Sequence, residues 1–269
     1  MRQLVLLVQI TVLVLAMCGC QRPLVFESLP PVAMLSPMEG SGSGGARTTG
    51  LGQGVWVGDR VLTAAHNIWS SEGGWISEVM MHGGASGGSE RLRIRSLRTG
   101  APDLDAERLV ELKGVQHDWA AFEVDAKGPR GTRMLVADPI VRPGDELIVA
   151  GWELEEAGRT ESTATLRMWR ATAVRVVRER NVPFELPEGV FAISIRVEGE
   201  IGPREGWSGA MVGRFDREEG LLSYIGQFVA MDTPEGRRIL WCVRPPDDVI
   251  EWLMEHADWD WDRRSVSRP

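Results

Sequence analysis

Residues 54–66 read Gly-Val-Trp-Val-Gly-Asp-Arg-Val-Leu-Thr-Ala-Ala-His. Two short β-rich runs, 55–57 and 61–63, flank a Gly-Asp turn, since Val and aromatic residues favour strands whereas Gly and Asp favour turns. The same alternation of β-rich runs with Gly, Pro and Asp turns continues through residues 91–97, 109–112, 120–124, 134–137, 146–150, 163–177, 190–197, 210–215, 223–230 and 238–243. Short strands at this spacing predict an all-β sandwich or barrel.

A polar stretch at residues 125–131 divides the β-rich region into two halves of similar length. One helix is predicted after them, at 245–258, because Pro246 suits a first helical position and two aspartates favour the positive N-terminal end. Its apolar stripe consists of Val249, Ile250, Leu253, Met254 and Ala257. We expect this helix to pack on the second half of the β-rich region, with residues 259–269 following as a tail.

The composition bounds the possible classes of protein. With 43% hydrophobic and 25% charged residues, the chain of 269 residues can bury a sizeable core, which excludes a disordered or fibrous protein. A formal net charge of −8 argues against duplex DNA as a partner, so we expect no nucleic-acid binding. Of three cysteines only Cys242 lies outside the first 20 residues, which predicts a buried thiol and no disulfide framework. The sequence has no CxxC pair and no histidine cluster, so we expect no metal site.

The N-terminus has the pattern of an export signal. Residues 1–20 carry one positive charge, Arg2, followed by an apolar run at 4–17. Because a membrane-spanning helix needs about 20 apolar residues, this shorter run favours a secretory signal over a permanent transmembrane helix.

The end of this segment suggests how the protein is anchored. Gly19, a small residue, directly precedes Cys20, and this resembles a bacterial lipoprotein signal. The resemblance implies a signal peptide at 1–19, lipidation of Cys20 and a protein anchored at the periplasmic or cell-surface face of a bacterial membrane. Acylation of Cys18 and an ordinary cleaved signal are the alternatives. Residues 20–49 are rich in Pro, Gly and Ser, which predicts a flexible tether.

Three segments carry residue types suited to nucleophilic catalysis. His66 follows a β-rich run and two alanines, Asp118 directly precedes an apolar strand, and Ser208 lies between glycines. Taken singly, a histidine after a strand is usually structural, the aspartate is typical of a turn, and the serine between glycines is typical of a plain β-turn. Together, their order with gaps of 52 and 90 residues reproduces the linear arrangement of the chymotrypsin type of triad.

With these motifs the chain resembles the trypsin-like serine peptidases, and more closely their bacterial HtrA-like branch, over about residues 50–256. Arg142-Pro143-Gly144-Asp145 is similar to the family's Pro-Gly-Asp turn, and Ile225-Gly226-Gln227 to the strand that pairs with substrate. The resemblance implies an all-β fold of two packed six-stranded antiparallel β-barrels, at 50–128 and 129–244, with one C-terminal α-helix. Only 61 residues follow Ser208, too few for the remaining barrel and a PDZ domain.

The resemblance also implies a function and a site. The protein would be a serine endopeptidase acting on a polypeptide, with no metal or organic cofactor. Ser208 would be the nucleophile, His66 the general base and Asp118 the residue that orients it. The backbone N–H groups of Gly206 and Ser208 would form the oxyanion hole. Substrate would contact Gly202 and the strand residues Gln227, Phe228 and Val229.

One departure from the family limits what carries over. Trp207 stands where the trypsins keep Asp and the HtrA-like branch usually Asn, which excludes maturation through an ion pair between a new N-terminal ammonium and that Asp. A bulky residue beside the oxyanion loop favours an alternative, a catalytically inactive trypsin-like domain that acts as a surface binding lipoprotein. An α/β-hydrolase with His256 as base fits less well, because a β-rich run and not a helix follows Ser208.

Overall fold

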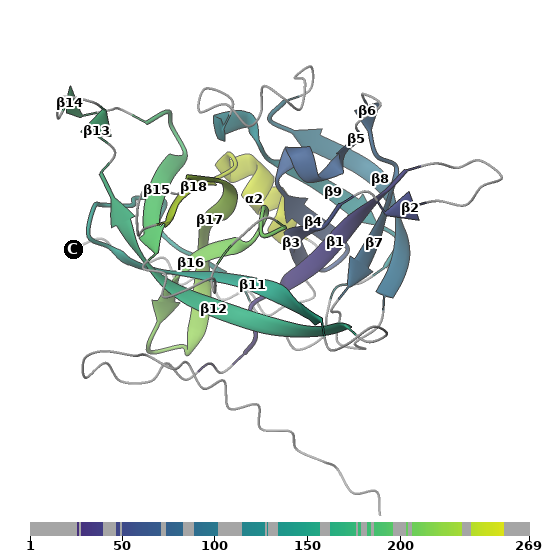
Figure 1. Cartoon of the computed structure of the whole chain (residues 1–269), viewed down its shortest axis with the longest axis horizontal. Helices are drawn as coiled ribbons and strands as arrows, with labels where there is room; N and C mark the ends of the chain where they lie inside the picture. The colour runs from purple at the N-terminus through teal and green to yellow at the C-terminus, as the bar shows by residue number, and fades with distance from the viewer. Residues whose placement is uncertain are drawn as a thin grey trace, which may run out of the picture.

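Two closed β-barrels account for most of the chain that can be described (Figure 1). The computed structural model describes residues 26, 28–39, 47–48, 50–70, 74–82, 89–101, 115–126, 128, 134–156, 162–175, 177–178, 182–183, 186–195, 203, 206–232 and 238–255. The predicted signal peptide, Cys20, Gly202, the run at 109–112 and the tail at 259–269 lie outside these residues. Among the residues described, no helix is long and apolar enough to cross a membrane.

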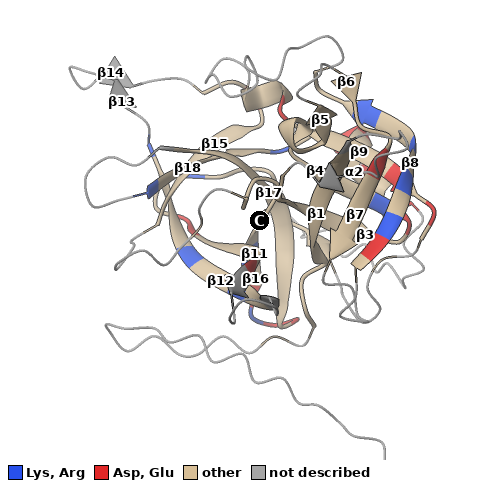
Figure 2. Ribbon diagram, turned by 45° about the vertical axis from the view of Figure 1, so that its right-hand side comes forward, with Lys and Arg blue, Asp and Glu red and all other residues tan. Residues whose placement is uncertain are grey.

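The first barrel is a ring of six antiparallel strands. In order of pairing they are β1 (Val32–Glu39), β3 (Gly52–Val57), β4 (Arg60–Thr63), β9 (Ala120–Val124), β8 (Ser89–Thr99) and β7 (Glu78–His82). Pairing of β7 with β1 closes the ring, and the short β2 (Arg47–Thr48) extends one end of β1. Leu92 of β8 is buried between exposed Arg91 and Arg93, and Figure 2 shows acidic and basic residues along this strand, on the outside of the barrel.

The second barrel repeats the plan. Its ring consists of β17 (Leu221–Asp232), β16 (Met211–Asp216), β11 (Glu146–Glu156), β12 (Ser162–Val174), β15 (Val190–Ile195) and β18 (Arg238–Val243). Pairing of β17 with β18 closes it, and β10 (Leu135–Val136) runs parallel to β17 at its side. The predicted fold class, two six-stranded antiparallel barrels with a C-terminal helix, is therefore confirmed.

Short elements complete the described chain. They are the 3₁₀ helices η1 (Ala65–Ile68) and η2 (Val115–His117) and the two-residue strands β5 (Trp69–Ser70), β6 (Gly74–Trp75), β13 (Val177–Arg178) and β14 (Val182–Pro183). The short elements η1 and η2 both belong to the first half of the chain.

Each barrel has its own apolar core, and a third cluster joins residues of both barrels to the C-terminal helix.

Strand β1 corrects the predicted tether. Residues 32–39 fall within the stretch 20–49, yet Val32, Ala33, Met34 and Leu35 are at most 2% exposed and complete the first barrel. Pairing of β1 with both β3 and β7 closes this ring. The average composition of the stretch, rich in Pro, Gly and Ser, hides this apolar run, so the tether prediction is wrong for these residues.

The predicted C-terminal helix is present as α2 (Asp247–Met254), which is shorter than the predicted range 245–258 and has Pro246 as its N-cap residue and not in its first turn. It buries Val249, Ile250, Leu253 and Met254. It was expected to pack on the second barrel, but it also docks on the first. Trp252 lies against the guanidinium groups of Arg60 and Arg98, at 4.2 and 4.7 Å from the ring centroid. Arg60, which is 3% exposed, also donates a hydrogen bond to the Trp252 carbonyl. The sequence expectation missed this because Arg60 and Trp252 are far apart in the chain.

We expect Trp252→Ala to destabilise the protein by about 3 to 5 kcal/mol, since it removes a buried ring and leaves a cavity between the helix and the first barrel. Chemical denaturation measures this loss. Glu251→Ala, at an exposed position of the same helix, is the control and should change the free energy of unfolding by less than about 0.5 kcal/mol. Equal stability of the two variants would show that Trp252 does not hold the helix.

Candidate active site

His66 is presented by the turn that follows β4. The strand ends at Thr63, and η1 begins after Ala64, a residue small enough to be fully buried. Ala65, Asn67 and Ile68 of this turn are also buried, whereas the His66 side chain is 25% exposed. The turn therefore fixes the backbone of His66 and leaves its ring accessible.

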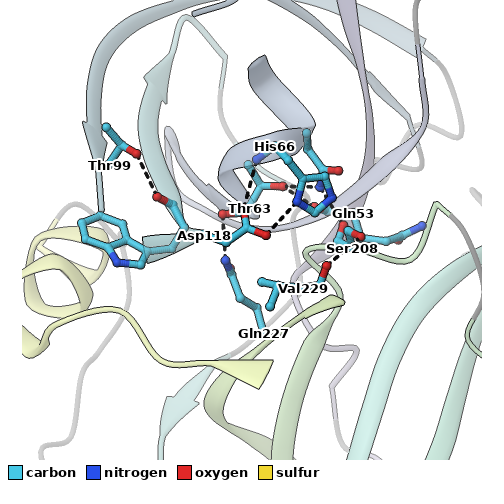
Figure 3. A network of polar contacts seen from close by, with 10 residues as sticks. Gln53, Thr63, His66, Thr99, Asp118, Ser208, Gln227 and Val229 are labelled. Atoms are coloured by element: carbon cyan, nitrogen blue, oxygen red, sulfur yellow. Dashed lines mark hydrogen bonds and ion pairs between the residues drawn. The ribbon is translucent and has the colours of Figure 1, made fainter. Parts of the chain in front are cut away.

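Both carboxylate oxygens of Asp118 accept hydrogen bonds from His66 (Figure 3). Oδ1 accepts a hydrogen bond from the His66 backbone N–H at 3.1 Å, and Oδ2 lies 2.8 Å from His66 Nδ1. Asp118 is 1% exposed and sits between η2 and β9. Because a carboxylate is an acceptor, Nδ1 carries the proton and Nε2 keeps its lone pair.

The electrostatics of this pair favour a cation on His66. Burial lowers the pKa of His66, but the negative charge of Asp118 and the hydrogen bond that the His66 ring donates to its carboxylate outweigh this, so that the pKa is raised above its ordinary value. The site therefore stabilises the imidazolium that forms when His66 accepts a proton.

Ser208 lies in the turn that leads into β16. The turn has positive φ angles at Gly206 (+86°) and Gly209 (+89°), and the Ala210 N–H donates to the Trp207 carbonyl at 2.9 Å. A Cβ at Gly209 would lie 1.9 Å from the Gln53 carbonyl oxygen, so only glycine fits there. Gly209 thus allows the backbone of this turn to lie in close contact with β3 of the first barrel.

The structure brings Ser208 to the segment that carries His66 (Figure 3). The side-chain amide of Asn67, the residue after His66, donates to the Ser208 carbonyl at 2.7 Å. The Ser208 hydroxyl itself donates to the Val229 carbonyl of β17 at 3.3 Å. Among the described residues the Ser208 hydroxyl has no hydrogen bond to His66 Nε2. Catalytic hydrogen bonds are often long or poorly aligned before substrate binds.

The candidate oxyanion donors are the N–H groups of Gly206 and Ser208. Within the described residues neither has a hydrogen-bond partner. The carbonyls of the same two residues are bound by Gln53: its Nε2 donates to the Gly206 oxygen at 3.2 Å, and its backbone N–H to the Ser208 oxygen at 2.7 Å. That the two N–H groups bind an oxyanion stays a prediction.

The predicted substrate contacts lie on β17. Gln227, Phe228 and Val229 are at most 2% exposed, and the Gln227 amide donates to the Thr63 carbonyl of the first barrel at 2.8 Å. The Gln227 side chain thus links the two barrels, a role that its position in the sequence did not indicate. Whether this strand contacts substrate stays a prediction.

Trp207, the main departure from the family pattern, points into the core of the second barrel. It is 2% exposed and packs against Gly151 of β11, where a Cβ would lie 2.8 Å from its ring. The ring is thus buried beneath the turn that carries Ser208.

Sequence reasoning missed Gln53 and Asn67. Both are buried polar residues that bind the turn carrying Ser208. The available signal was Gly52-Gln53-Gly54, a polar side chain between two glycines in an apolar strand. Cys242 is buried as expected, and burial raises the pKa of its thiol well above the ordinary value. In the described ranges no group of three or more His, Cys, Asp and Glu side chains is placed to hold a metal.

Comparison with protein-family models and with curated proteins finds no match to this sequence. The class therefore rests on the structure. Two closed six-stranded antiparallel barrels with a C-terminal helix are the architecture of the chymotrypsin-like fold.

Proposed function

We propose that the protein is a serine endopeptidase with His66, Asp118 and Ser208 as its catalytic residues. The observation that carries the proposal is the pair of hydrogen bonds that His66 donates to Asp118, from its backbone N–H and from Nδ1, because they leave Nε2 as an acceptor beside the turn that holds Ser208. This arrangement supplies a base with a defined tautomer and a raised proton affinity.

The reaction proceeds through an acyl-enzyme. Ser208 Oγ attacks the carbonyl carbon of the scissile peptide bond while His66 Nε2 takes its proton. The carbonyl oxygen becomes an oxyanion that accepts hydrogen bonds from the Gly206 and Ser208 N–H groups. His66 then gives the proton to the leaving amine. Water repeats the sequence on the ester, with His66 as base again, and releases the acid and free Ser208.

A second candidate is an inactive chymotrypsin-like domain that binds a partner. The hydrogen bond from the Ser208 hydroxyl to Val229 is the observation in its favour, because it directs the hydroxyl proton to Val229 and not to His66. A fluorophosphonate probe separates the two. Labelling of the wild type but not of Ser208→Ala supports the peptidase, and the absence of labelling in both supports the binding domain.

We expect kcat/KM to rise with pH through one ionisation whose midpoint lies above the ordinary imidazole value of about 6.5. Only neutral His66 accepts the Ser208 proton, and its pKa is raised in the folded protein, so activity is lost as pH falls through that raised value. Rates of peptide cleavage between about pH 5 and 9 measure the midpoint. A midpoint clearly below the imidazole value would contradict the role of Asp118.

We also propose that Cys20 is acylated after export. Phe26 already packs on Phe215 of β16, with ring centroids 4.7 Å apart, so the chain from Cys20 to Phe26 reaches at most about 20 Å. The anchor would therefore hold the second barrel close to the membrane. We expect label from a fatty-acid analogue to be lost in Cys20→Ser, with loss of membrane association. Label that persists in this variant would point to Cys18 or another anchor.

A further inference from the structure

Among the residues that the structure describes, Gln53 is the one in the first barrel that binds the carbonyls of both Gly206 and Ser208. Its side chain is fully buried in β3, and its Nε2 donates to the Gly206 carbonyl at 3.2 Å while its backbone N–H donates to the Ser208 carbonyl at 2.7 Å. We infer that Gln53 is a positioning residue that holds the turn 206–210 in the conformation required of an oxyanion hole. This inference rests on the proposed function.

The carboxamide of Gln53 is itself fixed. Besides Gly206, its Nε2 donates to the Trp152 carbonyl at 3.0 Å, and its Oε1 accepts from the Trp152 N–H at 3.0 Å. The Trp152 indole in turn donates to the Val32 carbonyl of β1 at 2.6 Å. A buried amide with all its polar groups paired is rigid, because each broken bond leaves an unsatisfied group away from water. The hydrogen bond to Gly206 is therefore donated by a carboxamide that its other hydrogen bonds hold in one orientation.

Three successive peptide units of the turn are held by hydrogen bonds. The unit 206–207 is held by Gln53 Nε2, and the unit 208–209 by Gln53 and Asn67 at its carbonyl and by Phe228 at its N–H. The unit between them directs its carbonyl to the Ala210 N–H. Since a peptide unit is planar and trans, fixing that carbonyl aims the Ser208 N–H the opposite way.

The turn needs such support because glycine allows other conformations. Gly206 has a φ of +86°, in a region where glycine also adopts alternatives at little cost, so its own backbone does not hold the carbonyl in place. Position 207 is a tryptophan and so offers no carboxylate to anchor the turn, and its ring packs in the core against Gly151. Neutral amides from the first barrel and apolar packing in the second thus take the place of an ion pair.

The effect on catalysis follows from this geometry. Loosening the unit 206–207 allows the adjoining unit 207–208 to rotate and its Ser208 N–H to turn away from the developing oxyanion, which weakens binding of the transition state more than binding of substrate. Loss of one oxyanion donor lowers turnover by about 10²- to 10³-fold, so loss of its support should cost less, about 10- to 100-fold. A merely structural role would lower stability and leave kcat of the folded enzyme unchanged.

The test uses Gln53→Met, which keeps the length of the side chain but none of the amide hydrogen bonds. Val79→Ala is the matched control, because Val79 is equally buried in the first barrel but lies on β7, whose pairing partners are β1 and β8. For each full-length protein we would measure the melting temperature, kcat and KM for a chromogenic peptide, and hydrogen exchange of the turn 206–210. If Gln53→Met does not fold, Gln53→Asn, whose amide is one methylene shorter, takes its place.

We expect Gln53→Met to lower kcat by about 10- to 100-fold with KM changed less than about threefold, and to speed exchange in the turn. Val79→Ala should lower the melting temperature but should change neither kcat nor hydrogen exchange in the turn. A kcat of Gln53→Met within about twofold of the wild type, or a loss shared by Val79→Ala, overturns the inference. If the wild type neither reacts with fluorophosphonate nor cleaves peptide, the proposed function fails, while unchanged exchange in Gln53→Met separately refutes the positioning of the turn.

Discussion

We expect Ser208→Ala to lower kcat for peptide cleavage by on the order of 10⁶, and His66→Ala to cause the same loss. Removing either residue abolishes the whole step, because attack by Oγ and transfer of its proton to Nε2 occur together. The double variant should be no worse than the single ones, since residues that act as a unit do not contribute additively.

Stability provides the control for this result. The described Ser208 side chain makes one hydrogen bond, to Val229 at 3.3 Å, so Ser208→Ala should leave the free energy of unfolding within about 1 kcal/mol of the wild type. Denaturation curves together with initial rates test both statements. A Ser208→Ala protein that still cleaves peptide at the rate of the wild type would refute Ser208 as the nucleophile.

Asp118→Asn should lower kcat by about 10⁴. Both oxygens of Asp118 accept hydrogen bonds from His66, one from the backbone N–H and one from Nδ1–H. An amide has only one acceptor, so its NH₂ must face one of these two donors. If it faces the ring, the proton moves to Nε2, which can then no longer accept the Ser208 proton. If it faces the backbone, two donors meet in a buried site.

The variant has a second readout. Without the charge of Asp118 the effect of burial remains, so the pKa of His66 should fall below its ordinary value. Titration of the His66 ring by NMR in the wild type and in Asp118→Asn measures this change, and rates measured on the same samples give kcat. Turnover equal to that of the wild type would remove Asp118 from the catalytic residues.

The fold could be predicted from the sequence because most of its strands are local patterns. Strands β3 and β4 show as apolar runs on either side of the Gly58-Asp59 turn, and α2 shows as an apolar stripe after Pro246. By contrast, the composition around β1 predicts a tether. Four apolar residues between prolines are ambiguous by themselves, and only pairing with β3 and β7 makes them a strand.

The candidate site divides in the same way. The order of His66, Asp118 and Ser208 and the glycines around Ser208 were visible in the sequence, since these residue types and spacings are recognisable one segment at a time. Three other features were not visible in the sequence. They are the hydrogen bond from the His66 backbone N–H to Asp118, the burial of Trp207 against Gly151 and the hydrogen bond from Gln227 to Thr63. Each of these joins positions whose separation in the chain carries no pattern.

The sequence by itself thus determined the β-rich halves, the C-terminal helix and the identity of the three candidate catalytic residues. Only the tertiary structure decided three further features: closure of each barrel, the docking of α2 on the first barrel and the support of the turn 206–210 by Gln53. The physical reason is the range of the interactions. Propensity and periodicity act over a few residues, whereas the hydrogen bond from Gln53 to Gly206 joins residues 153 positions apart and exists only once both barrels have folded.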